Sequence, residues 1–168
     1  MVLSRFVSRG VHQPQDRSSP PPVPGSALTA DGRVLQRAIT SGMRYELGID
    51  SFFGASHAMR PSGERHTHSF RVQASFHTDS VDANGMVVGF RDVTNLLDAE
   101  ARRYSGRFLN ELEPFTRIQA TGENLAAVIF RNLDAALGES LPGGPQLVTV
   151  TLWENPTSYV RVSRQEAA

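Results

Sequence analysis

Three of the five histidines lie close together in the sequence and could hold a metal ion. His66 and His68 are two residues apart in a segment whose apolar residues alternate as in a β-strand, so both imidazoles should project from one face. His57 ends the preceding strand-like segment, and a hairpin-like connection would bring it beside the pair. Three neutral imidazoles with an open fourth position are typical of a catalytic zinc site, although the spacing alone also fits surface or core histidines.

The other two histidines are left out of this candidate site. His77 lies nine residues after His68, and that odd separation places it on the opposite face of a strand. His12 lies in a polar N-terminal segment, where we expect it to be solvated. A zinc ion at the first three histidines would act as a Lewis acid on bound water or on a carbonyl group.

Missing residue types exclude several other kinds of chemistry. The 168-residue chain has no cysteine, which excludes a thiolate nucleophile, an iron–sulfur cluster, a thiolate zinc site and a disulfide. All 17 of its basic residues are arginines, so Schiff-base chemistry and a P-loop lysine are excluded as well. The formal net charge of zero argues against nucleic-acid binding, which normally needs a basic excess.

The chain is expected to form one domain after an N-terminal extension. Residues 1–42 form that extension, and within it residues 10–32 are rich in proline and serine, as in an extended or disordered linker. Residues 34–39 could form a helical turn, and residues 43–168 form the folded domain. No apolar run is long enough to span a membrane and no secretory signal is evident. The absence of cysteine fits a cytoplasmic protein.

Hydrophobic periodicity predicts the elements that would position the histidines. Apolar residues alternate in four segments and recur at helical spacing in two, the second with Thr121 as its N-cap. The pattern predicts strands over residues 45–57, 67–78, 147–153 and 158–163, and helices over residues 91–104 and 122–138. This order of strand, strand, helix, helix, strand, strand predicts an α+β fold with two helices on one face of an antiparallel sheet.

Six short motifs follow one another in an order that resembles a known enzyme family. They are Phe53–His57, Arg65–Phe70, Gly85–Phe90, Phe108–Asn110, Thr121–Asn124 and Trp153–Glu154. Together they resemble the 6-pyruvoyltetrahydropterin synthase and 6-carboxytetrahydropterin synthase family over residues 44–164. The resemblance implies a tunnelling fold (T-fold) whose subunits join their sheets into a barrel, usually as a hexamer or a tetramer. It also implies that His57, His66 and His68 hold Zn²⁺.

The resemblance also suggests which residues bind the substrate. Glu154 matches a glutamate that holds the 2-amino-pyrimidinone edge of the pterin, and a carboxylate can accept two parallel N–H bonds from such an edge. Thr121 and Glu123 match a threonine and a glutamate at the start of the second helix. Local reasons also explain all three, because Glu154 could be a solvated strand-end acid, Thr121 an N-cap and Glu123 a first-turn acid.

The acid–base residues depart from the family pattern. The usual catalytic cysteine is replaced by Ser62, a poor base, so the nearest carboxylate, Glu64, is the first candidate base. Ser105 and Gly106 stand where the family has an aspartate–histidine pair, and Gly89 stands where it has another aspartate. Proton transfer would then fall to Glu64, to Tyr104 or to zinc-bound hydroxide.

Two functions remain open from the sequence. In the first, the chain is a zinc-dependent lyase-type enzyme of a specialised biosynthetic pathway. It would perform elimination, retro-aldol or cyclisation chemistry on a pterin-like or other carbonyl- and hydroxyl-bearing small molecule. In the second, the chain is a non-catalytic ligand-binding protein or an inactive partner subunit of the same fold. Retention of all three candidate ligands favours the enzyme, and we expect a homo-oligomer that binds neither nucleic acid nor membrane.

Overall fold

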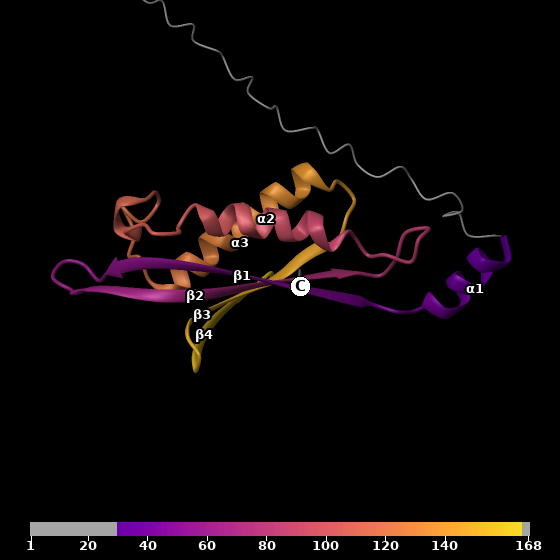
Figure 1. Cartoon of the computed structure of the whole chain (residues 1–168), viewed down its shortest axis with the longest axis horizontal. Helices are drawn as coiled ribbons and strands as arrows, with labels where there is room; N and C mark the ends of the chain where they lie inside the picture. Colours follow the sequence, from indigo (N-terminus) through magenta and orange to yellow (C-terminus); the bar gives the residue numbers. More distant parts are fainter. Residues whose placement is uncertain (1–29, 166–168) are drawn as a thin grey trace, which may run out of the picture.

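The computed structural model describes residues 30–165, which form one four-stranded antiparallel sheet with helices packed on one of its faces (Figure 1). The sheet order is β1-β2-β3-β4, so β1 and β4 are its edge strands. The elements in chain order are α1 (Ala30–Thr40), β1 (Tyr45–Ala58), β2 (Arg65–Thr78), α2 (Phe90–Arg102), the 3₁₀ helix η1 (Leu109–Glu111), α3 (Gly122–Ser140), β3 (Gln146–Asn155) and β4 (Ser158–Ser163). The predicted α+β order is confirmed, with α1 preceding it.

Alternation along the strands explains why the helices cover only one face. Leu47, Ile49 and Phe53 are buried on β1, and Phe70 and Val72 are buried on β2, while their neighbours in sequence are more exposed. This apolar face packs against α2 and α3, which lie together along the sheet (Figure 1). Each large side chain that is fully buried there contributes about 1.5–3 kcal/mol to folding.

The element boundaries differ from the predicted ones in places that local geometry explains. The helix α3 continues through Gly138, the predicted stop, and ends at Ser140. Leu141 precedes Pro142 and leaves the helical region, because a proline disfavours helical backbone in the residue before it. At the other end of the chain, α1 spans eleven residues and contains the predicted turn over residues 34–39. The predicted linker over residues 10–32 lies outside the described residues up to residue 29, and its last three residues were predicted wrongly, because residues 30–32 form the first turn of α1.

Two side-chain amides hold the end of the β1–β2 hairpin against the segment that follows α2. The side chain of Asn110 accepts from the backbone N–H of Ala58 (2.9 Å) and donates to the carbonyl of the same residue (2.8 Å). Gln119 makes the same pair of bonds with the backbone of Arg60, both at 3.0 Å. Because β1 is an edge strand, these backbone groups have no neighbouring strand to bond, and the two amides take its place. The amides thereby fix the position of the end of β1.

The hairpin turn itself depends on one glycine. The N–H of Gly63 donates to the carbonyl of Met59 at 2.6 Å, and a Cβ at position 63 would lie 2.4 Å from that oxygen. A side chain there would force the turn apart.

No helix of residues 30–165 is long and apolar enough to cross a membrane.

Candidate metal centre

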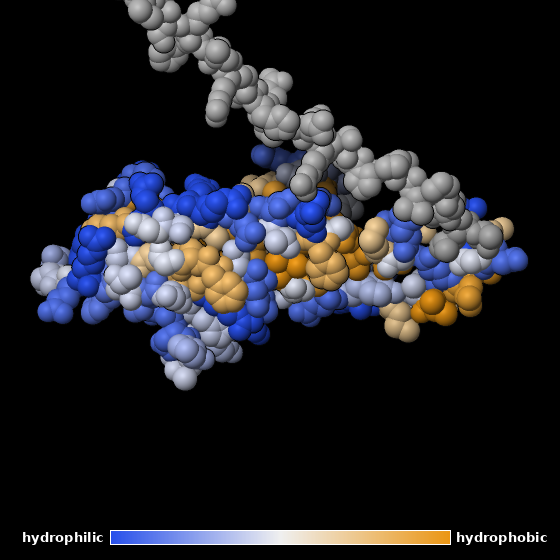
Figure 2. All heavy atoms as spheres, in the orientation of Figure 1, coloured by the Kyte–Doolittle hydropathy of each residue, from blue (hydrophilic) through white to orange (hydrophobic). Residues whose placement is uncertain are grey.

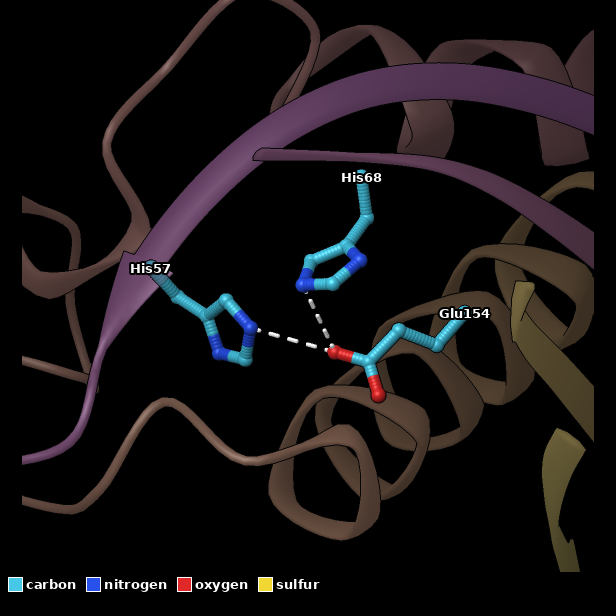
Figure 3. A group of neighbouring side chains, drawn as sticks. All are labelled: His57, His68 and Glu154. Atoms are coloured by element: carbon cyan, nitrogen blue, oxygen red, sulfur yellow. Dashed lines mark ion pairs between the residues drawn. The ribbon is translucent and has the colours of Figure 1, made fainter. Parts of the chain in front are cut away.

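Three side chains from three strand ends converge at one point on the helix-covered side of the sheet (Figure 3). The Nε2 atoms of His57 and His68 lie 3.1 Å and 3.2 Å from the same carboxylate oxygen, Oε1 of Glu154. One potential ligand atom from each residue lies within 4.8 Å of the other two. Within the described residues, this is the one group of three or more such side chains that could hold a metal ion.

Strand register explains why His57 and His68 meet. His57 pairs with His66 and Ala55 pairs with His68 across β1 and β2, so the two imidazoles are diagonal neighbours on one face. Their ring centroids are 5.1 Å apart. His77 lies on the other face, where its Nε2 is 3.3 Å from Glu46, as its odd spacing predicts.

Glu154 reaches the two histidines from an irregularity in β3. The pairing of β3 with β4 shifts between Trp153 and Asn155, so Glu154 has no cross-strand partner in β4. Such a bulge bends the strand and redirects a side chain, and bulges are common beside active sites. The carboxylate, half-buried, is therefore aimed at the imidazoles.

A backbone carbonyl fixes which nitrogen of His57 faces the carboxylate. Nδ1 of His57, which is buried, lies 2.5 Å from the carbonyl oxygen of Ala120, just before α3. Because a carbonyl can only accept, Nδ1 carries the proton, and in the neutral ring Nε2 is left with a lone pair. This lone pair faces an oxygen of Glu154, and two acceptors at 3.1 Å need a proton or a cation between them.

The donor set fits a divalent transition metal. Imidazole nitrogens and a carboxylate oxygen are ligands that zinc accepts, and a ligand histidine typically donates its other N–H to a carbonyl, as His57 does here. Burial of the phenyl ring of Phe70 beside both histidines, at centroid distances of 6.4 Å and 5.6 Å, lowers the polarity around the point of convergence. The residues present therefore fit zinc.

His66, the third predicted ligand, lies beside this group but is not part of it. Its ring centroid is 6.4 Å from that of His57 and 6.3 Å from that of His68. The side chain is exposed at the end of β2. The structure therefore gathers His57 and His68 with Glu154, and it leaves His66 at the rim.

Of the two residues predicted at the start of α3, Thr121 is the N-cap. Its Oγ1 accepts from the N–H of Asn124 at 3.2 Å, which is the local role that the sequence also allows. Glu123 is exposed in the first turn of α3. Both follow directly on Ala120, whose carbonyl contacts His57, so the start of α3 borders the candidate metal centre.

Ser62 and Glu64 lie in the exposed hairpin loop that leads to His66. Over the described part of the chain, neither side chain makes a hydrogen bond or an ion pair. Tyr104, in contrast, is buried, and its hydroxyl donates to Glu100. Burial, reinforced by this bond, raises the pKa of Tyr104 above its ordinary value of 10.

Tyr104 is also separated from the histidines by two phenylalanine rings. Successive ring centroids run from Tyr104 to Phe53 (5.6 Å), from Phe53 to Phe70 (5.1 Å) and from Phe70 to His68 (5.6 Å). Tyr104 is therefore the one predicted site residue that lies in the interior, away from the point where the others converge or border the site. His57, His68 and Glu154 converge, while Tyr104 belongs to the interior between α2 and α3.

Sequence reasoning missed two partners of the site. The carbonyl of Ala120 has no sequence signal, because every residue carries one. The side chain of Asn110, which holds the end of β1, belongs to the Phe108–Asn110 motif, whose sequence indicates a family resemblance but no contact with β1. No sequence signal places Glu154 beside the histidines, because the bulge there depends on the register of β3 with β4.

Comparison with known proteins gives one family. The family model described as 6-pyruvoyl tetrahydropterin synthase matches residues 46–165, which is most of the chain. No curated protein sequence matches the chain.

Solved structures share the fold at low sequence identity. The 6-pyruvoyl tetrahydropterin synthase of Caenorhabditis elegans matches with a TM-score of 0.65 and 18% identity, over 73% of this chain and 97% of that one. A Plasmodium vivax 6-pyruvoyltetrahydropterin synthase, described as a catalytic-residue mutant with a glutamate changed to alanine, matches with a TM-score of 0.59 and 16% identity, over 74% and 99%. An uncharacterized Wolinella succinogenes protein gives 0.59 and 16%, over 74% and 100%. These likenesses confirm the expected T-fold of the single chain.

Proposed function

The chain belongs to the 6-pyruvoyl tetrahydropterin synthase family, and from that premise we propose that it is a zinc-dependent lyase-type enzyme. Its substrate would be a pterin-like or other small molecule with carbonyl and hydroxyl groups. Its chemistry would be elimination, retro-aldol cleavage or cyclisation, in a specialised biosynthetic pathway. The observation that carries this proposal is the convergence of His57 and His68 on one oxygen of Glu154.

The proposed zinc ligands are His57 and His68, with the third position taken by His66 or by Glu154. Zinc, when bound, would supply a Lewis acid that stabilises negative charge on a substrate oxygen. His57 is held for this role by Ala120, and His68 is held by strand pairing. If His66 supplies the third nitrogen, Glu154 is released to accept N–H bonds from a 2-amino-pyrimidinone edge.

We propose Thr121 and Glu123 as further substrate contacts because they begin α3 beside Ala120. The exposed carboxylate of Glu123 can accept a hydrogen bond from a ligand above the histidines. The backbone N–H groups of the first helical turn also favour negative charge at this end of α3.

Glu64 is the proposed general base, since it is the nearest carboxylate in sequence to His66 and is exposed to a ligand. Support comes from the Plasmodium vivax enzyme, in which a glutamate is described as a catalytic residue. Ser62 would act only as a hydrogen-bonding group, because a serine without a base is a weak proton acceptor. The Tyr104 hydroxyl is committed to Glu100 and is not proposed to transfer protons.

A binding protein without turnover is the second candidate. Ser105 and Gly106 replace the expected acid–base pair, and the Gly106 N–H donates to the carbonyl of Gly54 at 2.7 Å. That segment thus pairs with the edge of β1 and offers no titratable side chain at these two positions. A ligand could then bind at the histidines without being converted.

Zinc content and turnover test the proposal together. We expect about one zinc per chain, lost in His68→Ala, with His66→Ala and Glu154→Gln measured in parallel to identify the third ligand. His77→Ala, on the opposite face, is the matched control and should keep its zinc. Absence of zinc from both the wild-type and the His77→Ala proteins would remove the mechanism. Turnover of dihydroneopterin triphosphate or of carbonyl-bearing candidates separates the enzyme from the binding protein.

Two broader expectations belong to the same proposal. Residues 43–168 would form the catalytic domain behind the N-terminal extension, and the chain would assemble as a cytoplasmic hexamer or tetramer. The assembly would depend on contacts between chains. Light scattering would then give a molar mass several times the 18.4 kDa of one chain, and a mass of one chain would contradict the assembly.

A further inference from the structure

A hollow of about 330 Å³ lies on the far side of the hairpin from the histidines. It forms where the loop after α2 meets the edge of β1, and its lining includes Ser56, Arg65, Thr67, Ser105, Gly106 and Arg107. Arg65 and Thr67 alternate along β2 with His66 and His68, so they project from the opposite face of the sheet. The hollow is therefore separate from the candidate metal centre.

Arg65 is held in place beside this hollow by two contacts. Its Nε donates to the hydroxyl oxygen of Ser56 at 2.9 Å. Its guanidinium carbon lies 4.5 Å from the centre of the Phe108 ring, within the range of a cation–π contact. The Ser56 side chain is in turn held near the carbonyl of Arg107. These contacts use one N–H of Arg65 and leave its two terminal amino groups for a ligand.

The positive charge of the hollow is not balanced by acids. Over residues 30–165, neither Arg65 nor Arg107 lies within ion-pair distance of a carboxylate, although five other arginines do. No aspartate or glutamate lines the hollow. The hollow is therefore lined by two arginines and by the hydroxyl-bearing residues Thr67 and Ser105, with no carboxylate among them.

We propose that this hollow binds a phosphate ion or a phosphoryl group. Two arginines and two hydroxyl-bearing residues around one hollow can offer many N–H and O–H donors, and a phosphate group presents three or four oxygens to accept from them. An arginine side chain held by a serine hydroxyl and an aromatic ring can bind two phosphate oxygens at once through its planar fork. The inference does not depend on zinc or on turnover, since it uses none of the proposed ligands.

Calorimetric titration of the full chain with inorganic phosphate tests the site. Arg65→Gln and Arg107→Gln should each weaken binding by roughly tenfold, as expected for loss of charge-assisted hydrogen bonds. Arg131→Gln removes the same charge from an exposed position on α3 and should leave the affinity unchanged. Arg65→Lys keeps the charge but loses the fork, so it should also weaken binding.

Three results would overturn the proposal. They are no binding of millimolar phosphate, equal weakening in Arg131→Gln, or loss of binding in His68→Ala, which would place the phosphate at the metal centre. A fourth result, acetate bound as tightly as phosphate, would also overturn the proposal, because it would show a site for carboxylates instead. Circular dichroism would reveal whether Arg65→Gln unfolds. In that case the same titration is made with Arg107→Gln and with Thr67→Val, which change exposed side chains, and each should weaken phosphate binding.

Discussion

Among single residues, Glu64 and Glu154 differ in burial, and this difference suits the two separate roles proposed for them. Glu154 is half-buried against two imidazoles, where it can bind a cation. Glu64 is exposed and has no partner among the residues that the structure describes, where it is available for proton transfer. The family resemblance alone does not predict this difference, because the burial of each side chain depends on the three-dimensional fold.

Glu64→Gln should slow turnover far more than it changes zinc affinity. The amide keeps the size and polarity of the side chain but cannot accept a proton, and general-base groups typically contribute 10²–10⁴-fold to rate. Rates and zinc dissociation constants of the variant and of the wild type measure the two effects separately. Glu139→Gln, an exposed change at the end of α3, is the matched control. An unchanged rate in Glu64→Gln would exclude this residue as the base.

Among the secondary-structure elements, the β1–β2 hairpin positions both histidines, and its end is held from outside by Asn110 and Gln119. Sequence periodicity predicted both strands and the shared face, because alternation is a local property of the chain. The amide contacts and the bulge at Glu154 were not predictable in this way. They join segments about fifty residues apart or depend on the register of β3 with β4.

Asn110→Ala should destabilise the fold and loosen the site together. It removes two hydrogen bonds to the backbone of Ala58, next to His57, at an expected cost of about 1–3 kcal/mol. Urea unfolding would measure the free energy, and a zinc titration would measure the weaker affinity. Asn95→Ala, at an exposed position of α2, should change both by much less. Equal effects from the two variants would contradict a positioning role for Asn110.

At the level of the whole molecule, a buried polar group joins α2 to α3 inside the apolar core. Glu100 accepts from Tyr104, from Asn132 at 2.8 Å and from Arg103 at 3.0 Å. Sequence patterns assigned Tyr104 to the possible chemistry, but the fold assigns it to this network. A tyrosine near a motif carries no signal for its depth, since burial depends on how two helices pack on a sheet.

The network predicts how global stability changes at alkaline pH. Because the folded pKa of Tyr104 is raised above 10, the folded state holds this proton more tightly than the unfolded state. Its contribution to stability is complete below pH 10 and is lost as the pH rises beyond that value. Urea unfolding at a series of pH values should show a smaller alkaline loss of stability in Tyr104→Phe than in the wild type. Parallel curves for the two proteins would refute the assignment.

The alternation of residues 65–68 across the sheet limits how this protein can change over evolution. His66 and His68, both candidates for the proposed zinc site, project from one face of β2, while Arg65 and Thr67 project from the other. A deletion that shifted β2 by a single residue would exchange the two sets, placing a guanidinium among the imidazoles. Insertions and deletions that the protein tolerates in this hairpin should therefore leave each residue of β2 on its present face of the sheet, whatever the length of the loop.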